Sequence, residues 1–177
     1  MSLASELRYQ PRPANPVQRV VQAFGASRPG AWLFSRILPP IDTLVQRLTR
    51  RRHTLPSLLA GLPVVDLTTT GRRSGRPRTT HLIAVPYGDA LAVLGTNFGQ
   101  PATPTWVLNL EAHPQARLSY RHRVVDVVAR PLAGDEAEEL LLRAERLYAG
   151  YRIYQGRITG RRLRIFALES AAGDRPA

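Results

Sequence analysis

The sequence predicts an α+β domain in which about six short strands form a small antiparallel barrel, preceded by an N-terminal helical extension. Beyond Pro63, apolar and β-branched runs alternate with turns rich in Gly and Pro, which is typical of short strands. Between these runs lie stretches with apolar residues at three- and four-residue spacing, which predict helices. Many short strands with interposed helices favour an antiparallel barrel over a parallel sheet.

The first third of the chain predicts an arm followed by amphipathic helices. Residues 1–16 are polar and Pro-rich and are expected to form a loose arm, whereas residues 17–60 carry short apolar stripes at helical spacing. We place the domain boundary so that residues 1–57 form the arm and helices and residues 58–177 form the barrel domain. Within residues 17–52 the stripes alternate with arginines, the pattern of a helix on an anionic membrane surface. The alternative is that these helices pack on the barrel or on a second subunit.

The remaining elements follow in chain order from the same patterns. A short helix is expected over residues 104–112, and a longer helix over residues 134–148 begins with acidic residues in its first turn. A tight turn is expected at His122-Arg123. The predicted strands cover residues 63–70, 77–86, 90–96, 115–121, 124–131 and 163–168.

Composition limits the class of protein. The chain has 177 residues, of which 44% are hydrophobic, and this is enough for one domain with a substantial core. Cysteine is absent, which excludes disulfides and thiolate metal sites. No run approaches the roughly 20 apolar residues that span a bilayer, and the N-terminus lacks the pattern of a secretory signal. We therefore expect a cytoplasmic protein, with peripheral attachment to the inner face of the cell membrane as a further expectation.

The charge of the chain points to an anionic partner. The formal net charge is +12, and all 25 basic residues are Arg. Arg stays protonated and binds carboxylates and phosphates through a planar fork, so the excess favours nucleic acid, acidic lipid or an acidic small molecule. A compositional bias of the source genome also explains the absence of Lys, but it does not explain why the arginines cluster.

One such cluster lies between the first two predicted strands. Within eight residues after Gly71 come four arginines and Ser74. A turn on a rigid hairpin can direct Arg side chains, backbone N–H groups and a hydroxyl at one anion, which predicts a site for a phosphate-bearing ligand. A solvated hairpin tip is the alternative, and residues 75–78 also resemble the core of an AT-hook, a DNA minor-groove arm. The basic residues of this turn are Arg72, Arg73, Arg76 and Arg78.

Two further groups are candidates for ligand contact. The loop at residues 96–100 is small and polar and follows a strand, so it can bring N–H groups to a ligand or can be a plain connection. Trp106 and Asn109 are three residues apart and share one face of the expected helix, where the alternative is a core Trp beside a structural Asn.

Three tyrosines near the C-terminal end of the longer helix are a further candidate group. Their i, i+3, i+6 spacing places the phenols on one face if the segment is helical, where they could donate protons. Packing in the core is an equally good interpretation. The residues are Tyr148, Tyr151 and Tyr154.

Other chemistries lack their motifs. The four histidines show no metal-ligand spacing and no accompanying carboxylate cluster, so we predict no metal site. Ser74 is one position away from the place that a nucleophile elbow requires, which argues against a hydrolase. The phosphate-binding motifs GxxxxGK[ST] and GxGxxG do not occur.

Four segments together resemble the deazaflavin-dependent nitroreductase family, whose members are split β-barrel proteins that use coenzyme F420. The resemblance covers about residues 58–169 in unbroken order, and the combination is specific although each segment alone is not. The segments are TTTGRRSGRPR, NFG, PTWVLNLEAHP and the three tyrosines.

The resemblance implies a role for each segment. The arginine turn would contact the acidic phosphate–lactyl–glutamate tail of the cofactor, the NFG loop would line the deazaflavin, and the Trp–Asn pair would lie beside the cofactor. The tyrosines would cover the substrate face. The implied cofactor-binding residues are Arg72, Arg73, Ser74, Arg78, Thr96, Asn97, Gly99, Trp106 and Asn109, and the implied catalytic residues are Tyr148, Tyr151 and Tyr154.

The implied function is an F420-dependent oxidoreductase that transfers a hydride between reduced deazaflavin and an apolar acceptor: a quinone, an enone or a nitroaromatic. Ile83 and Asn97 stand where some nitro-reducing members have a tyrosine and a basic residue, so the acceptor stays open. The alternatives are a non-catalytic deazaflavin-binding protein, a flavin mononucleotide protein of the related split-barrel group, and a basic nucleic-acid binder. We expect no specific nucleic-acid partner, and a homo-oligomer is a further expectation.

Overall fold

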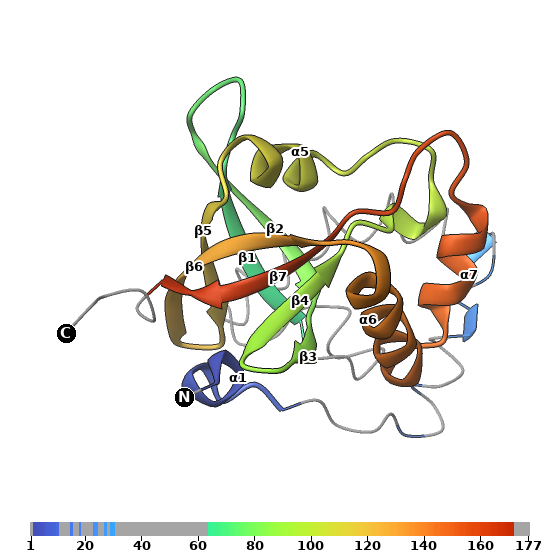
Figure 1. Cartoon of the computed structure of the whole chain (residues 1–177), viewed down its shortest axis with the longest axis horizontal. Helices are drawn as coiled ribbons and strands as arrows, with labels where there is room; N and C mark the ends of the chain where they lie inside the picture. Colours follow the sequence, from blue (N-terminus) through green and yellow to red (C-terminus); the bar gives the residue numbers. More distant parts are fainter. Residues whose placement is uncertain are drawn as a thin grey trace.

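The fold is one curled antiparallel sheet with helices around it (Figure 1). The computed structural model of the chain describes residues 2–10, single positions between 15 and 30, and the continuous stretch 64–171. In that stretch the strands lie in the order β2-β1-β5-β6-β7-β4-β3, which confirms the expected α+β antiparallel barrel architecture. The strands are β1 (Val64–Thr70), β2 (Pro77–Ile83), β3 (Val85–Tyr87), β4 (Ala90–Leu94), β5 (Gln115–Tyr120), β6 (Arg123–Leu132) and β7 (Ile165–Ser170).

The sheet has seven strands where the sequence predicts about six, because the run predicted over residues 77–86 forms both β2 and β3. β2 pairs with β1 and β3 pairs with β4, so the chain passes from one edge of the sheet to the other at the fully buried Ala84. This crossing brings the two edges together and curls the sheet into a half-barrel. β-propensity gives no sign of it, since both sides of the bend have strand-forming residues.

The strands β4 and β7 separate two hydrophobic cores, so they are buried on both faces over most of their length. Leu91 and Val93 point into the barrel, whereas Ala92 and Leu94 pack on the other side beneath the helix α6 (Gly134–Leu147). The helix α7 (Gly150–Arg157) continues this second core. α6 and α7 therefore cover one side of the sheet, and α7 brings the predicted tyrosines with it.

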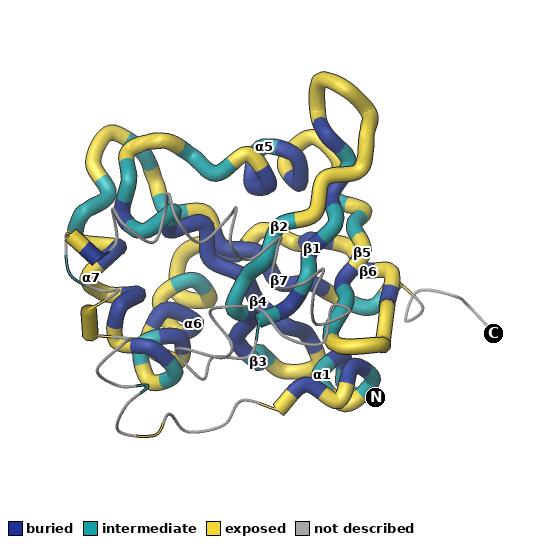
Figure 2. The backbone as a smooth tube through the Cα atoms, turned by 180° about the vertical axis from the view of Figure 1, so that it is seen from behind, coloured by how far each residue is buried: buried dark blue, intermediate teal, exposed yellow. Residues whose placement is uncertain are grey.

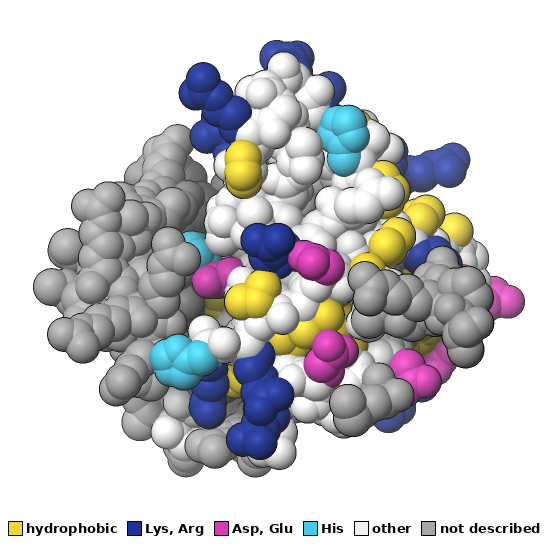
Figure 3. All heavy atoms as spheres, turned by 90° about the vertical axis from the view of Figure 1, so that its left-hand side faces the viewer, with side chains coloured by type: hydrophobic (Ala, Val, Ile, Leu, Met, Phe, Trp, Pro, Cys, Tyr) yellow, Lys and Arg dark blue, Asp and Glu magenta, His cyan; other side chains and the backbone are white. Residues whose placement is uncertain are grey.

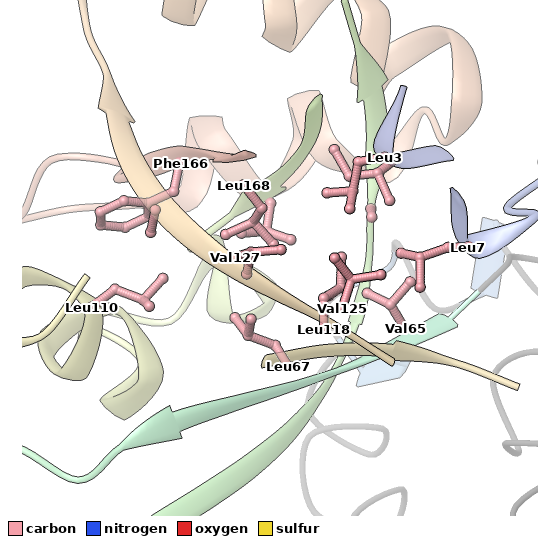
Figure 4. Packing of buried hydrophobic residues seen from close by; sticks show 14 of the residues in the cluster. Leu3, Leu7, Val65, Leu67, Leu110, Leu118, Val125, Val127, Phe166 and Leu168 are labelled. Atoms are coloured by element: carbon pink, nitrogen blue, oxygen red, sulfur yellow. The ribbon is translucent and has the colours of Figure 1, made fainter. Parts of the chain in front are cut away.

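The N-terminal residues close one end of the barrel and do not form the loose arm that the sequence suggests. The helix α1 (Leu3–Leu7) inserts Leu3 and Leu7 into the core beside Val65 and Val125 (Figure 4). Tyr9 follows it into the core, and its hydroxyl donates a hydrogen bond to the carbonyl of Ala84. A five-residue helix is too short to show as a periodic pattern, which is why Pro-rich composition misled the prediction.

Several other expectations can be compared with the structure. The helix α5 (Thr105–Ala112) and the helix α6 lie within one residue of their predicted bounds, and the turn expected at His122-Arg123 lies one residue earlier, at Arg121-His122. The predicted amphipathic helices at 17–52 fall almost entirely outside the described residues, and the division at residue 57 stays a prediction. No helix within the described residues is long and apolar enough to cross a membrane.

Candidate cofactor and substrate site

The arginine turn projects from the sheet between β1 and β2. Its residues 72–79 are exposed, and Figure 2 shows the projecting tip as a continuous exposed segment beside α5. In the view of Figure 3, Arg side chains gather at the top of the molecule, where this hairpin ends. The turn thus presents a concentration of positive charge to solvent, as the sequence predicts.

Hydrogen bonds within the turn give it a defined shape. The N–H of Gly71 donates to the carbonyl of Arg76 at 2.9 Å, and the N–H of Gly75 donates to the carbonyl of Gly71 at 2.7 Å. Gly75 has φ +64°, a left-handed conformation that favours glycine. A Cβ on Gly71 would lie 2.8 Å from Oγ of Ser74, so a larger residue there would displace the serine hydroxyl.

Asn109 on α5 fixes the base of the turn. Its side-chain oxygen accepts a hydrogen bond from the N–H of Arg72 at 3.0 Å, and its side-chain nitrogen donates to the hydroxyl of Thr69 at 3.0 Å. Asn109 is only 1% exposed. The structure therefore assigns Asn109 a positioning contact to the arginine turn, and the direct cofactor contact implied by the resemblance stays a prediction.

The arginines of the turn lack carboxylate partners. Within the described residues no ion pair involves Arg72, Arg73, Arg76 or Arg78, whereas arginines elsewhere, such as Arg117 with Asp126 at 3.1 Å, are paired. Unpaired guanidinium groups on a shaped turn can accept a bidentate carboxylate or phosphate without first breaking an ion pair. This is the electrostatic requirement of a polyanionic ligand.

Trp106 lies on the same helix as Asn109 but belongs to the barrel core. It is 5% exposed, and its ring packs edge-on against Phe166 with centroids 6.1 Å apart. A Cβ on Gly95 would lie 2.7 Å from Cγ2 of Val107, so the end of β4 also packs closely against α5. The helix is therefore held between the sheet and the loop that follows β4.

That loop, residues 96–100, has an uncommon backbone conformation. Asn97, Phe98 and Gly99 all have positive φ, at 46°, 56° and 79°, around the short 3-10 helix η1 (Asn97–Gly99). Left-handed conformations at residues other than glycine are costly and are often held in place at ligand sites. The side-chain nitrogen of Asn97 donates to the carbonyl of Ala102 at 2.9 Å and so helps to fix the turn.

Arg161 holds this loop from the other side, and no pattern in the sequence indicates this contact. Its guanidinium donates to the carbonyl of Gly95 at 2.9 Å, to that of Thr96 at 2.8 Å and twice to that of Gln100, both at 3.1 Å. Burial and the neighbouring charge of Arg164 lower the pKa of Arg161. One partly buried side chain thus joins the two ends of the loop.

The three tyrosines come together, although not as one helical stripe. Tyr148 has extended backbone at the end of α6, and Tyr151 and Tyr154 lie in α7. The hydroxyls of Tyr148 and Tyr154 are hydrogen-bonded at 2.9 Å, and the rings of Tyr148 and Tyr151 pack edge-on at 5.7 Å. A Cβ on Gly150 would overlap the Tyr148 ring, so glycine is needed for this fold of the chain. The segment from Tyr148 to Tyr154 is thus not one continuous helix, but the three tyrosines lie together.

All three phenols are buried, which decides their acidity. Burial raises the pKa of Tyr148, Tyr151 and Tyr154 above the ordinary value, so each is neutral at physiological pH. Tyr148 and Tyr154 share a hydrogen bond, whereas the hydroxyl of Tyr151 makes none with any described residue. Tyr151 is thus the phenol of the cluster whose hydroxyl makes no hydrogen bond within the described residues.

The loop and the tyrosine cluster form one unit. Phe98 packs edge-on against Tyr154 with ring centroids 5.8 Å apart, and a Cβ on Gly99 would lie 2.7 Å from Cβ of Arg157 on α7. The arginine turn and α5 lie at one side of Figure 1 and η1 with α7 at the other, joined by the segment between η1 and α5. The predicted site residues thus form two groups on one continuous part of the chain.

Comparison with known proteins shows the family of the chain. The sequence model of the F420H(2)-dependent quinone reductase family matches residues 42–170, which is most of the chain. The chain belongs to this family. The match covers the arginine turn, the loop at residues 96–100, α5 and the tyrosine cluster.

Individual relatives agree with this placement. The F420H(2)-dependent quinone reductase Rv1261c of Mycobacterium tuberculosis is 34% identical over 70 residues, which is 40% of this chain and 47% of that protein. The alignment thus spans about half the length of the curated relatives that the chain matches. A solved structure of an F420-H2 dependent reductase, FDR-A, is 33% identical with a TM-score of 0.55, covering 60% of this chain and 94% of that one. A structure described as a domain-swapped dimer is 29% identical with a TM-score of 0.57, covering 73% of this chain and 99% of that one.

The residues of this quinone reductase family member fit the coenzyme that the family uses. F420 has a polyanionic tail and a flat tricyclic ring. The unpaired arginines of the β1–β2 turn suit the tail, and the strained loop with its buried Thr96 and Gly99 offers backbone close to a ring. Within the described residues no group of His, Asp or Glu side chains could hold a metal ion.

Proposed function

We propose that the protein is a reductase that uses F420H2 to reduce an apolar quinone. The observation that carries the proposal is the arrangement of two groups in one family member: unpaired arginines on a shaped turn, and a buried phenol cluster packed against a strained loop. The first suits a charged cofactor tail, and the second suits an apolar, proton-requiring acceptor. A protein that only stores the cofactor would not need the phenols.

The proposed roles of the residues follow from their placement. The turn arginines Arg72, Arg73 and Arg78 bind the acidic tail together with the Ser74 hydroxyl, and Asn109 positions the turn. Thr96, Asn97 and Gly99 line the deazaflavin ring. Trp106 supports α5, the helix between the proposed tail site and the proposed ring site. When bound, the reduced coenzyme supplies a hydride, so the protein's own residues are left to bind, orient and protonate.

Tyr151 is the proposed proton donor. A quinone that has accepted a hydride carries one negative oxygen and needs one proton. The Tyr151 side chain as a whole is 5% exposed and its hydroxyl makes no hydrogen bond to any described residue, whereas the hydroxyls of Tyr148 and Tyr154 are hydrogen-bonded to each other. A phenol in this position can contribute about 10²–10⁴ in rate as a general acid. We expect Tyr151→Phe to lower kcat with little change in cofactor affinity.

One experiment tests the function and its rivals together. Fluorescence titration with F420 and with flavin mononucleotide identifies the cofactor, and turnover of F420H2 with menadione, an enone and a nitroaromatic identifies the acceptor. We expect F420 to bind and menadione to be reduced. Binding of F420 without turnover of any acceptor would favour a carrier protein, and preferential binding of flavin mononucleotide would overturn the proposal.

Two finer statements belong to the same proposal. We propose that residues 17–52 attach the protein to anionic membrane surfaces, where a lipid-soluble quinone resides, because apolar stripes and arginines alternate there. Equal, negligible co-sedimentation with anionic and neutral vesicles would refute this. We also propose a homo-oligomer, supported by likeness to the structure described as a domain-swapped dimer. A monomeric mass in light scattering at micromolar concentration would refute it.

A further inference from the structure

Arg157, at the end of α7, has a buried nitrogen with no partner. In the part of the chain that the structure describes, its Nη1 atom is the one buried side-chain polar atom that lacks a hydrogen bond. A buried donor without a partner costs on the order of 1–3 kcal/mol, and more when it is charged. Such a group calls for an explanation, and a missing ligand is one of the few available.

The surroundings of Arg157 indicate which ligand would fit. Its aliphatic stem packs against the backbone of Gly99, whose Cβ would lie 2.7 Å from Cβ and 3.2 Å from Cδ of Arg157. Its charge is close enough to the phenols to lower the pKa of Tyr148 and Tyr154, in opposition to the larger effect of burial. The guanidinium therefore lies where the proposed cofactor loop and the proposed acceptor site meet.

Structural explanations do not account for the arrangement. A cation in the last turn of a helix is favourable, but this effect needs only the charge and is available to an exposed side chain. Arg152 on the same helix shows the ordinary arrangement, because it is exposed and paired with Glu145 at 2.7 Å. Arg157 instead forms no ion pair within the described residues, and its Nη1 is buried without a hydrogen-bond partner.

We propose that Arg157 binds the oxygen of the acceptor that becomes negative during reduction. This inference rests on the proposed quinone reductase function and adds an anion-binding residue to its acceptor site. The site then contains one fixed cation, the hydrogen-bonded hydroxyls of Tyr148 and Tyr154, and the Tyr151 phenol proposed as proton donor, which suits an acceptor with a flat apolar body and one oxygen that can carry a negative charge.

The chemistry balances with these groups. The reduced coenzyme would supply the hydride by breaking a C–H bond, and an O–H bond forms at one quinone oxygen. The product is a hydroquinone monoanion whose other oxygen carries the negative charge. Nη1 of Arg157 donates a hydrogen bond to that oxygen, where preorganised charge is most effective. A phenol then donates one proton to give the neutral hydroquinone, and solvent returns a proton to the phenolate. The quinone is reduced by two electrons and the deazaflavin is oxidised by two.

A binding measurement without turnover tests the proposal. The probes are 2-hydroxy-1,4-naphthoquinone, which is an anion at neutral pH, and 2-methoxy-1,4-naphthoquinone, which has a similar shape and no charge. Their dissociation constants are measured with the full chain saturated with oxidised F420. Arg157→Gln is compared with the parent, with Arg157→Lys, and with Arg152→Gln as the matched control on the exposed side of α7.

The expected pattern is specific to the anion. The parent should bind the anionic probe more tightly than the neutral one, and Arg157→Gln should weaken the anionic probe by about 10- to 100-fold while changing the neutral probe less than about twofold. Arg157→Lys should recover part of the preference, because the charge remains and the fork is lost. Arg152→Gln should behave as the parent.

Several results would overturn the inference. A parent that binds both probes equally would show that no cation faces the acceptor, whether or not any variant folds. Equal weakening of both probes in Arg157→Gln would show that the residue only packs against Gly99. These outcomes differ from failure of the proposed function, which would appear as absence of F420H2 turnover with menadione in the parent.

Discussion

Replacement of Arg161 by Gln should loosen the cofactor loop and destabilise the domain. The Arg161 guanidinium makes four hydrogen bonds to three backbone carbonyls, those of Gly95, Thr96 and Gln100. A glutamine side chain is shorter and offers two donors, so at least one end of the loop loses its contact. Lys at this position would keep the charge but could not reach all three carbonyls at once.

The magnitude follows from the number of carbonyls and their exposure. Each carbonyl that loses its donor costs about 1 kcal/mol net, and partial access of water replaces some of the bonds. We therefore expect a loss of about 2–3 kcal/mol in the free energy of unfolding. For a domain of this size each kcal/mol lowers Tm by roughly 2–4 °C, so Tm should fall by about 4–12 °C.

The loop should also lose its preorganisation for the cofactor. Residues 96–100 would have to be ordered on binding, at a cost of order 1–2 kcal/mol for each residue fixed, so the Kd for F420 should rise by about tenfold or more. Urea unfolding measures the loss of stability, and fluorescence titration measures the Kd for F420. Amide hydrogen exchange of residues 95–103 measures the loss of order in the loop. Arg162→Gln is the matched control, because Arg162 is the next residue in the sequence and its side chain is exposed. Equal stability, exchange and affinity in the two variants would refute the assigned role of Arg161.

Four further predictions test other parts of the structure. Arg78→Ala should raise the Kd for F420 by about 2- to 10-fold, less than for a buried contact because the side chain is exposed, and Arg117→Ala should not change it. Asn109→Leu should lower the free energy of unfolding by about 2–3 kcal/mol and weaken F420 binding, since Thr69 and the arginine turn both lose a partner; an unchanged Kd would separate the turn from the cofactor. Gly99→Ala should cost about 1–3 kcal/mol in urea unfolding because φ is +79° and the new Cβ meets Arg157, whereas Gly156→Ala, with open space around it, should be neutral or stabilising. Burial raises the pKa of the tyrosines at positions 9, 148, 151 and 154, so above about pH 10 the unfolded chain releases protons that the folded chain keeps, and stability should fall with rising pH. Absorbance titration should show these phenols ionising only as the protein unfolds, and ionisation of all six tyrosines near pH 10 in folded protein would contradict it.

Local patterns in the sequence predicted the parts of the site that depend on local structure. The β1–β2 turn follows from Gly71, Gly75 and the flanking β-branched runs, and α5 follows from its apolar spacing and the proline after its end. Asn109 was singled out as a candidate from the PTWVLNLEAHP segment. Its spacing from Trp106 could not tell which groups its amide would contact. These elements are decided within about ten residues of chain.

The parts that the sequence did not reveal depend on contacts between distant segments. Arg161 stands among Arg162 and Arg164, and nothing in the pattern distinguishes the one that binds backbone carbonyls some 60 residues away. Backbone carbonyls occur at every residue, so such a contact leaves no partner to find in the sequence. The packing of the Tyr148 ring was hidden for a similar reason, because Gly150 signals freedom of the backbone but not the ring that fills its space.

The described arginines fall into three kinds, according to the groups that they bind, and these kinds explain where the chain concentrates its positive charge. Surface arginines such as Arg117 and Arg130 pair with carboxylates on neighbouring strands or helices, and a genomic preference for Arg over Lys is sufficient to explain them. Arg161 binds carbonyls and is explained by the loop that it holds. The turn arginines and Arg157 have neither kind of partner within the described residues. Positive charge without a protein partner is therefore placed at the proposed tail and acceptor positions, where an anionic ligand would supply the missing partner.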